Sequence, residues 1–276
     1  MSDLKCDLIT ALVERWRLET YTFHLSCGVC TITLEDIALQ LEFPIDNIVV
    51  TGFSTLSDPE TLCYDLLGRS PGDGDDELTT LRFSWLNTTF EYLPSTATER
   101  EVMCVVRAYI MHKIGGVLML DANNNKVHLI YLSPLSDLYA TRSYSWGSTV
   151  LGTLYRELCR MTKCRAVDID GCLVLLQSWA LYRMPFLVSV TLQTYGFQLV
   201  NRWSFSLGNE RSYTLLIYRQ MIETYAGERF AWMSYSFLDI VAIVPYSTYI
   251  HSHLWCINAP LLNFSTIEWY NGDRVL

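Results

Sequence analysis

The chain has 276 residues, of which half are apolar and 18% are charged, with a formal net charge of −9. So much apolar side chain excludes a mainly disordered protein, and the acidic balance disfavours nucleic-acid binding, which depends on neutralising phosphates. The longest apolar stretch, 172–190, is interrupted by Gln177, Arg183 and Pro185, so we expect a core helix there and no membrane span.

The first half of the chain alternates predicted helices with predicted hairpins. Apolar residues at helical spacing predict a helix over 7–18, and β-rich runs at 21–25 and 30–34 predict a hairpin. Start and stop signals predict further helices between Thr33 and Pro44, Asp58 and Gly68, and Thr98 and Gly116. An exposed acidic loop at 70–77, a helix around 81–86 and a second hairpin joining 117–120 to 127–131 complete this half.

The second half begins with stronger helical patterns and ends with weaker ones. Apolar periodicity predicts amphipathic helices over 146–161 and 213–225, and an almost wholly apolar, central helix over 171–183. Strand-like pieces are expected at 240–244 and 261–270. With no repeat or clear linker, the sequence predicts one α+β domain over 1–276, predominantly helical, with a few short antiparallel hairpins.

Two groups of metal-ligating side chains stand far apart in the chain: Cys27, Cys30, His251, His253 and Cys256. Structural zinc is often held by two such groups, so these residues are a zinc candidate. A redox C-x-x-C is a second interpretation, although redox sites of that type lie in a βαβ unit and not in a hairpin. We favour a third interpretation, a tight turn whose shape depends on Gly28, and we expect no metal or cofactor.

The basic residues that could contact a partner are Arg15, Arg17, Arg156, Arg160, Lys163 and Arg165. Arg156 and Arg160 share a helical face near the end of the predicted helix, where positive charge complements the helix dipole. The alternative is a contact with an acidic partner or with phosphate. The chain has no P-loop, nucleophile elbow or zinc-protease motif. None of its four lysines stands beside a phosphate-binding loop, as a pyridoxal-phosphate enzyme would require, so we expect the chain not to be an enzyme.

Several sequence segments, which follow one another in order along nearly the whole chain, resemble the plant mobile domain of the Maintenance-of-Meristems-like proteins. They include TITLEDIALQL at 31–41, SYSWGS at 143–148, LYRELCR at 154–160, GCLVLLQSWA at 171–180 and EWYNGDRVL at 268–276. The segment 185–211 matches least and is expected to be a variable insert.

The resemblance implies a nuclear plant protein that acts in meristem maintenance, gene-expression control and transposon silencing. It also implies a protein partner, with a phosphatase 7-like protein as one candidate, and no membrane. Relatives are named after a phosphatase or an aminotransferase, but this chain has the motifs of neither. We therefore expect a non-catalytic interaction module that binds DNA weakly or indirectly. The alternative is a transposon-derived nucleic-acid-binding domain, in which the arginines face a phosphate backbone.

Overall fold

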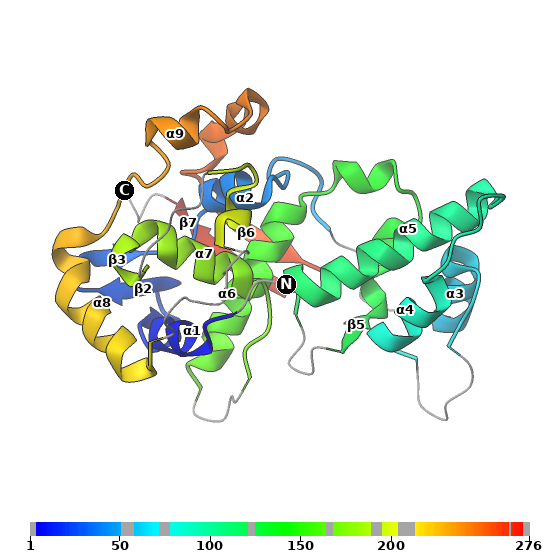
Figure 1. Cartoon of the computed structure of the whole chain (residues 1–276), viewed down its shortest axis with the longest axis horizontal. Coiled ribbons are helices and arrows are strands. Elements are labelled where there is room, and N and C mark those ends of the chain that lie inside the picture. Colours follow the sequence, from blue (N-terminus) through cyan, green and yellow to red (C-terminus); the bar gives the residue numbers. More distant parts are fainter. Residues whose placement is uncertain are drawn as a thin grey trace.

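The computed structural model describes residues 4–50, 58–71, 78–120, 125–163, 168–188, 195–203, 213–264 and 266–272. Helices dominate these ranges, and their strands form three short antiparallel sheets (Figure 1). The predicted class, a mainly helical α+β fold with short hairpins, is confirmed. Within the described ranges, no helix combines the length and the apolar character that crossing a membrane requires.

The first helix is shorter than the sequence predicts. Helix α1 (Cys6–Val13) ends five positions before Leu18, and three strands of one sheet follow: β1 (Trp16–Arg17), β2 (Thr22–Leu25) and β3 (Gly28–Cys30). Trp16 is buried against Phe23, with ring centroids 4.8 Å apart. This packing between neighbouring strands outweighs the helical spacing of Trp16 with α1. The hairpin predicted around the C-x-x-C is confirmed.

The capped helices of the first half begin where the sequence predicts. They are α2 (Leu34–Leu41), α3 (Pro59–Leu67) and α5 (Glu99–Lys113). Capping boxes at Thr33 and Thr98 satisfy free backbone N–H groups of α2 and α5, and Asp58 caps α3. Gly68 ends α3 with φ +72°, a left-handed conformation that favours glycine.

The second predicted hairpin is wrong. Residues 117 and 118 belong to a π-helical turn (Ile114–Leu118) that continues α5, while β5 (Lys126–His128) pairs with β4 (Thr80–Arg82). Leu81 and Val127 face each other in this pair and are both buried. Their burial beside α4 (Phe83–Phe90) selects the long-range pairing over the local one.

The helices of the second half follow the predicted order, and a further helix stands where a strand is predicted. These helices are α6 (Trp146–Met161), α7 (Leu173–Arg183), α8 (Leu215–Arg229) and α9 (Leu238–Val241). The strand expected at 240–244 is wrong, because Ile240 and Val244 point into one apolar cluster at helical spacing. The piece at 261–270 is a hairpin of β6 (Asn258–Asn263) and β7 (Thr266–Asn271). Short 3-10 helices span Leu129–Tyr131, Ser133–Leu135, Ala140–Ser143, Pro185–Leu187, Leu199–Trp203, Tyr246–Tyr249 and Ser252–Leu254.

The largest hydrophobic core surrounds α7, as the apolar pattern predicts. Trp179 on α7 is fully buried. The other side chains of this core come from α1, α2, α6, α8 and the first sheet. A second core joins α3, α4 and α5 to the β4–β5 pair at the opposite end of the molecule (Figure 1). Trp146 packs against both cores and links them.

The described parts of the expected insert, 185–188 and 195–203, are attached to the core. Leu187 and Leu199 are buried, and the Leu199 carbonyl accepts a hydrogen bond from Tyr182 on α7 at 3.1 Å. Variability of 185–211 among relatives stays a prediction. Residues 189–194 of the insert, its end at 204–211, and most of the acidic loop, 72–77, lie outside the described residues.

Candidate functional site

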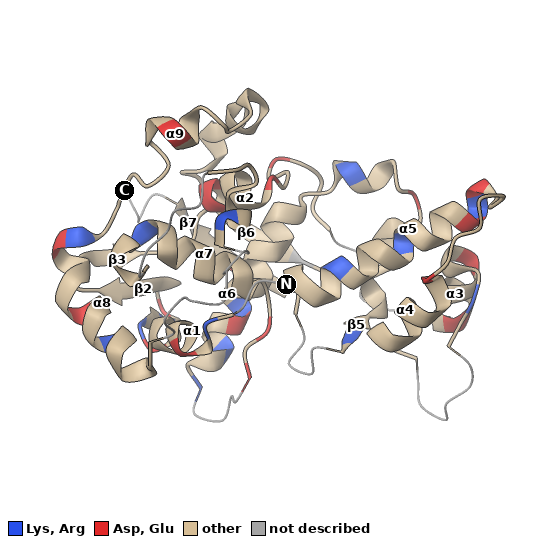
Figure 2. Cartoon of the chain, in the orientation of Figure 1, with Lys and Arg blue, Asp and Glu red and all other residues tan. Residues whose placement is uncertain are grey.

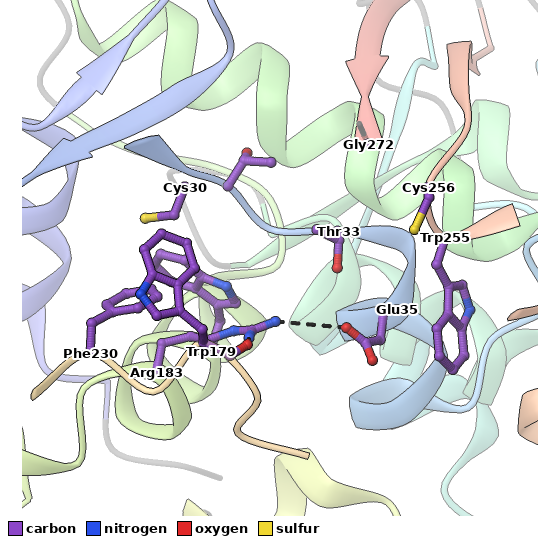
Figure 3. Close-up of a pocket in the computed structure, with 11 residues that line it drawn as sticks. Cys30, Thr33, Glu35, Trp179, Arg183, Phe230, Trp255, Cys256 and Gly272 are labelled. Atoms are coloured by element: carbon purple, nitrogen blue, oxygen red, sulfur yellow. Dashed lines mark hydrogen bonds and ion pairs between the residues drawn. The ribbon is translucent and has the colours of Figure 1, made fainter. Parts of the chain in front are cut away.

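A small aromatic pocket lies between α2, α7 and the segments 230–232 and 255–256 (Figure 3). Its volume is about 180 Å³, and it is lined by Cys30, Thr31, Thr33, Glu35, Trp179, Arg183, Phe230, Trp232, Trp255, Cys256 and Gly272. Pockets for drug-sized ligands measure roughly 300–1,000 Å³. This pocket is therefore sized for a single side chain or a comparably small group.

Arg183, at the end of α7, is the buried cation of the pocket. Its Nη2 lies 3.3 Å from Oδ1 of Asp36, and its Nη1 donates a hydrogen bond to the Trp232 carbonyl. The guanidinium also lies over the ring of Tyr235, 5.3 Å from the centroid. These contacts surround the guanidinium with a carboxylate, a carbonyl and an aromatic face, which compensate for the burial of its charge.

Asp36 is the fully buried partner of Arg183. Its Oδ2 accepts a hydrogen bond from the backbone N–H of Thr33 at 2.7 Å, and its own backbone N–H donates to the Thr33 hydroxyl oxygen at 3.3 Å, which together form the capping box of α2. The Thr33 hydroxyl also donates to Oδ2 at 2.8 Å. Its Oδ1 accepts a further bond from the Tyr235 hydroxyl at 2.6 Å. The same residue thus starts α2 and anchors α7 and the 230–236 segment around the pocket.

Glu35 is the carboxylate that lines the pocket, and it is partly buried. It stands 3.8 Å from Nη2 of Arg183, and one third of its side chain (33%) is exposed. Burial, with the neighbouring charge of Asp36, raises the pKa of Glu35 to about 7, although Arg183 opposes this shift. Glu35 therefore titrates near neutral pH, where it can change charge or respond to a bound ion.

The two cysteines of the C-x-x-C lie in the first hairpin. Hydrogen bonding between their thiols lowers the pKa of Cys27, and the same contact together with burial raises the pKa of Cys30. Gly28 between them adopts φ +125°, which supports the interpretation of a glycine-dependent turn. Cys30 reaches the pocket, whereas Cys27 is absent from its lining.

The distant half of the zinc candidate has other contacts. Nε2 of His251 lies 3.0 Å from Asp46, and the rings of His251 and His253 are 6.2 Å apart. Cys256 lines the pocket opposite Cys30 (Figure 3). Within the described ranges, no three His, Cys, Asp or Glu side chains gather in an arrangement that could hold a metal ion.

Within the described ranges, three of the six predicted basic residues form ion pairs with acidic side chains. Arg15 pairs with Glu223 at 2.7 Å, and Arg17 donates to the carbonyls of Glu14 and Trp16. Arg156 and Arg160 flank the buried Glu157, at 3.4 and 2.7 Å. Lys163 lies just beyond α6, and Arg165 lies outside the described residues. Figure 2 shows basic and acidic residues interspersed along the ribbon.

Sequence reasoning missed the pocket and the surface beside it. Phe230, Trp232 and Trp255 stand outside regular helices, so periodicity gives them no role. One signal was available: between Phe230 and Ile267 the sequence has a single Asp, Glu, Lys or Arg, namely Asp239. A charge-poor stretch of this length, outside the central helix, indicates a surface or pocket that binds another molecule.

Comparison with known proteins places the chain in a family. The Plant mobile domain family matches residues 2–276. An Arabidopsis thaliana protein named Serine/threonine-protein phosphatase 7 long form homolog is 36% identical over 98% of this chain and 21% of its own length. Protein MAINTENANCE OF MERISTEMS and Protein MAIN-LIKE 1, from the same plant, are 30% and 31% identical over 99% of this chain.

The chain spans 56% of MAINTENANCE OF MERISTEMS and 53% of MAIN-LIKE 1, so the relatives are longer proteins. No solved structure shows significant similarity. The match covers every element described above, including the helix that carries Arg183 and the hairpin that carries Cys30. The chain belongs to the plant mobile domain family and is related to MAINTENANCE OF MERISTEMS.

Proposed function

We propose that the domain is a non-catalytic protein-interaction module of a nuclear protein that acts in meristem maintenance, gene-expression control and transposon silencing. The observation that carries the proposal is an exposed apolar surface, called here the α9 surface. It consists of Trp232, Met233, Phe237, Leu238, Val241, Tyr246 and Ile250. Figure 1 shows α9 and the turns after it projecting from the body of the molecule.

The α9 surface has the composition of a protein interface. Leu238 and Tyr246 are 84% exposed and Met233 is 75% exposed, although each is large and apolar or aromatic. In Figure 2 the ribbon of this part of the molecule is almost free of charged residues. Interface centres are depleted in charge and enriched in aromatic residues and methionine. Leaving such a surface in water is unfavourable, so a protein partner that covers it gains apolar burial.

The pocket offers little for catalysis. Glu35 is the one carboxylate among the described residues that line it, and no described histidine lines it. The raised pKa of Cys30 favours the neutral thiol, which is a poor nucleophile. These features support a binding role. Hydrolysis of a phosphoester by the pure protein, abolished by a chelator, would overturn the non-catalytic part of the proposal.

The partner we propose is a protein, with a phosphatase 7-like protein as the first candidate, as the resemblance to the Maintenance-of-Meristems-like proteins implies. The test is affinity capture from plant nuclear extract, followed by mass spectrometry. Leu238→Asp places a charge on the α9 surface, and Tyr139→Asp places one at an equally exposed position elsewhere. We expect proteins that the unchanged domain and the Tyr139 variant retain to be lost with the Leu238 variant. Equal retention by all three would contradict the α9 surface.

The alternative, a nucleic-acid-binding domain, depends on the arginines. Arg156, Arg160, Lys163 and Arg165 would supply about four phosphate contacts and a log–log salt slope near −3.6. The ion pairs of Arg15, Arg156 and Arg160 reduce the positive charge available for such contacts. We therefore expect weak binding to duplex DNA in an anisotropy titration across a salt series. Submicromolar affinity at physiological salt with a slope steeper than about −4 would favour the alternative.

A further inference from the structure

The pocket contains one more carboxylate than its guanidinium neutralises. Arg183 is paired with Asp36 at 3.3 Å and with the Trp232 carbonyl, whereas Glu35 lies farther away at 3.8 Å. No other described residue donates a hydrogen bond or forms an ion pair with Glu35. When Glu35 is ionised, the exposed side of the pocket is therefore negative and attracts a cation.

Aromatic rings stand on both sides of this carboxylate. Figure 3 shows Trp179 and Phe230 on one side of the Arg183–Glu35 pair and Trp255 on the other. Trp232 adds a fourth ring to the lining. The face of an aromatic ring is electron-rich and attracts cations within about 6 Å, most strongly where water is excluded. The rings and the carboxylate of Glu35 thus both attract a positively charged ligand.

The hydrogen-bonding groups of the pocket limit which cation fits. A primary ammonium has three N–H donors that need acceptors when it leaves water. The hydroxyl of Thr31 is already bonded to Tyr155 and to the Tyr21 carbonyl, and that of Thr33 is bonded to Asp36. Among the described lining side chains, the carboxylate of Glu35 is the available acceptor. A methylated ammonium keeps the positive charge but has fewer N–H donors. It therefore gives up fewer hydrogen bonds with water when it enters the pocket.

Two atoms of the pocket lining are hydrogen-bond donors without a partner among the described residues. The indole Nε1 atoms of Trp179 and Trp255 are buried and have no hydrogen-bond partner among the described residues. Buried donors in native proteins are nearly always paired with protein, water or ligand. A peptide that enters the pocket brings main-chain carbonyls as well as a side chain, and so supplies acceptors that an isolated cation lacks.

We propose that this pocket binds the trimethylated side chain of a lysine presented by a protein partner. The volume of about 180 Å³ suits one such group and excludes a nucleotide. The trimethylammonium would lie between Trp255 and Phe230, with Glu35 as its counter-ion and the buried Trp179 behind Phe230. This proposal shares one assumption with the proposed function, namely that the domain binds a protein, because the trimethylated lysine belongs to one.

The test is a titration of the whole chain with short, otherwise uncharged peptides, followed by tryptophan fluorescence and calorimetry. One peptide carries trimethyllysine, and its matched partners carry lysine or glutamate at the same position. We expect the trimethyllysine peptide to bind at least about tenfold more tightly than the lysine peptide, and the glutamate peptide not to bind. Equal affinity for lysine and trimethyllysine would overturn the proposal. Preference for glutamate would assign the pocket to anions that bind Arg183.

Matched variants locate the binding. Glu35→Gln removes the charge while keeping the shape, and we expect it to lower affinity for the trimethyllysine peptide about tenfold. Glu99→Gln is the control, because Glu99 also lies in the first turn of a helix with a capping box but is remote from the pocket. Trp232→Leu, at a half-exposed position, should weaken binding without unfolding the chain. Unchanged affinity in both pocket variants would place the peptide elsewhere. Leu238→Asp should leave peptide binding intact, so failure of either proposal can be recognised separately.

Discussion

The hydroxyl of Tyr235 donates a hydrogen bond of 2.6 Å to Oδ1 of Asp36, which lies 199 positions earlier in the chain. The same hydroxyl accepts a bond of 2.5 Å from Nε2 of Gln40. All three residues are buried, and Arg183 supplies the opposite charge beside them. This contact fastens the segment that carries the α9 surface to the helix that carries Glu35.

Tyr235→Phe tests that contact. The substitution removes the donor to a buried carboxylate and leaves the Gln40 amide without its acceptor, while the ring is retained. We expect the free energy of unfolding to fall by about 1–3 kcal/mol, measured by urea denaturation. Tyr246→Phe, at an exposed position, is the control and should leave stability unchanged. Equal stability of the two variants would show that the buried network contributes nothing.

Trp179→Ala tests the central position of α7. The indole is fully buried and stacks against Phe23, with ring centroids 5.0 Å apart. Its removal leaves a cavity in the main core, and we expect a loss of roughly 3–5 kcal/mol in the same measurement. Trp269→Ala removes the same side chain from a half-exposed position and should cost much less. An unfolding midpoint unchanged by Trp179→Ala would contradict the central role of this helix.

Local signals predicted the boundaries of helices, whereas long-range contacts decided the strands. The pairs Thr33–Asp36 and Thr98–Glu101 act within one helical turn, so the sequence locates both helix starts to the residue. The pairing of Leu81 with Val127 depends on a shared core, which no local pattern contains. The sequence therefore predicted the fold class and most helices, but assigned the second hairpin wrongly.

Apart from the charge-poor stretch after Phe230, nothing in the sequence indicated the pocket, for a related reason. Its walls come from a hairpin, two helices and two irregular segments that meet only in the folded chain. The C-x-x-C motif includes Cys30, which lines the pocket together with Cys256, but the other zinc candidates, Cys27, His251 and His253, do not line it. Chemical motifs are recognisable when their residues are close in sequence, and this pocket has no such motif.

Glu35→Gln should stabilise the protein in a pH-dependent manner. The pKa of Glu35 rises from an ordinary value near 4.5 to about 7 in the folded chain, so folding disfavours its ionised form. The free energy of unfolding of the wild-type protein thus falls as pH rises through this window. Well below pH 4.5, Glu35 is protonated in both the folded and the unfolded chain, so its raised pKa no longer affects stability. Allowing for solvent at a side chain one third exposed, we expect the variant to gain about 1–2 kcal/mol at pH 8 and almost nothing at pH 4. Urea denaturation at the two pH values measures this. A loss of stability at pH 8 would show that the ion pair with Arg183 outweighs the burial of Glu35.

Gly147→Ala should destabilise the contact between α6 and the segment that follows α2. A Cβ at this position would lie 2.7 Å from Cγ2 of Ile37 and 2.9 Å from the Pro44 carbonyl oxygen, which accepts a hydrogen bond from the Gly147 N–H. In an unobstructed helix, alanine would be favoured over glycine by up to about 1 kcal/mol. Here the backbone of residue 44 must move, so we expect a net loss of about 1–3 kcal/mol in thermal or urea unfolding. Gly196→Ala is the matched control, because no heavy atom lies within 4 Å of the added carbon. If Gly147→Ala were as stable as the unchanged protein, α6 and residue 44 would have to lie farther apart than the structure shows.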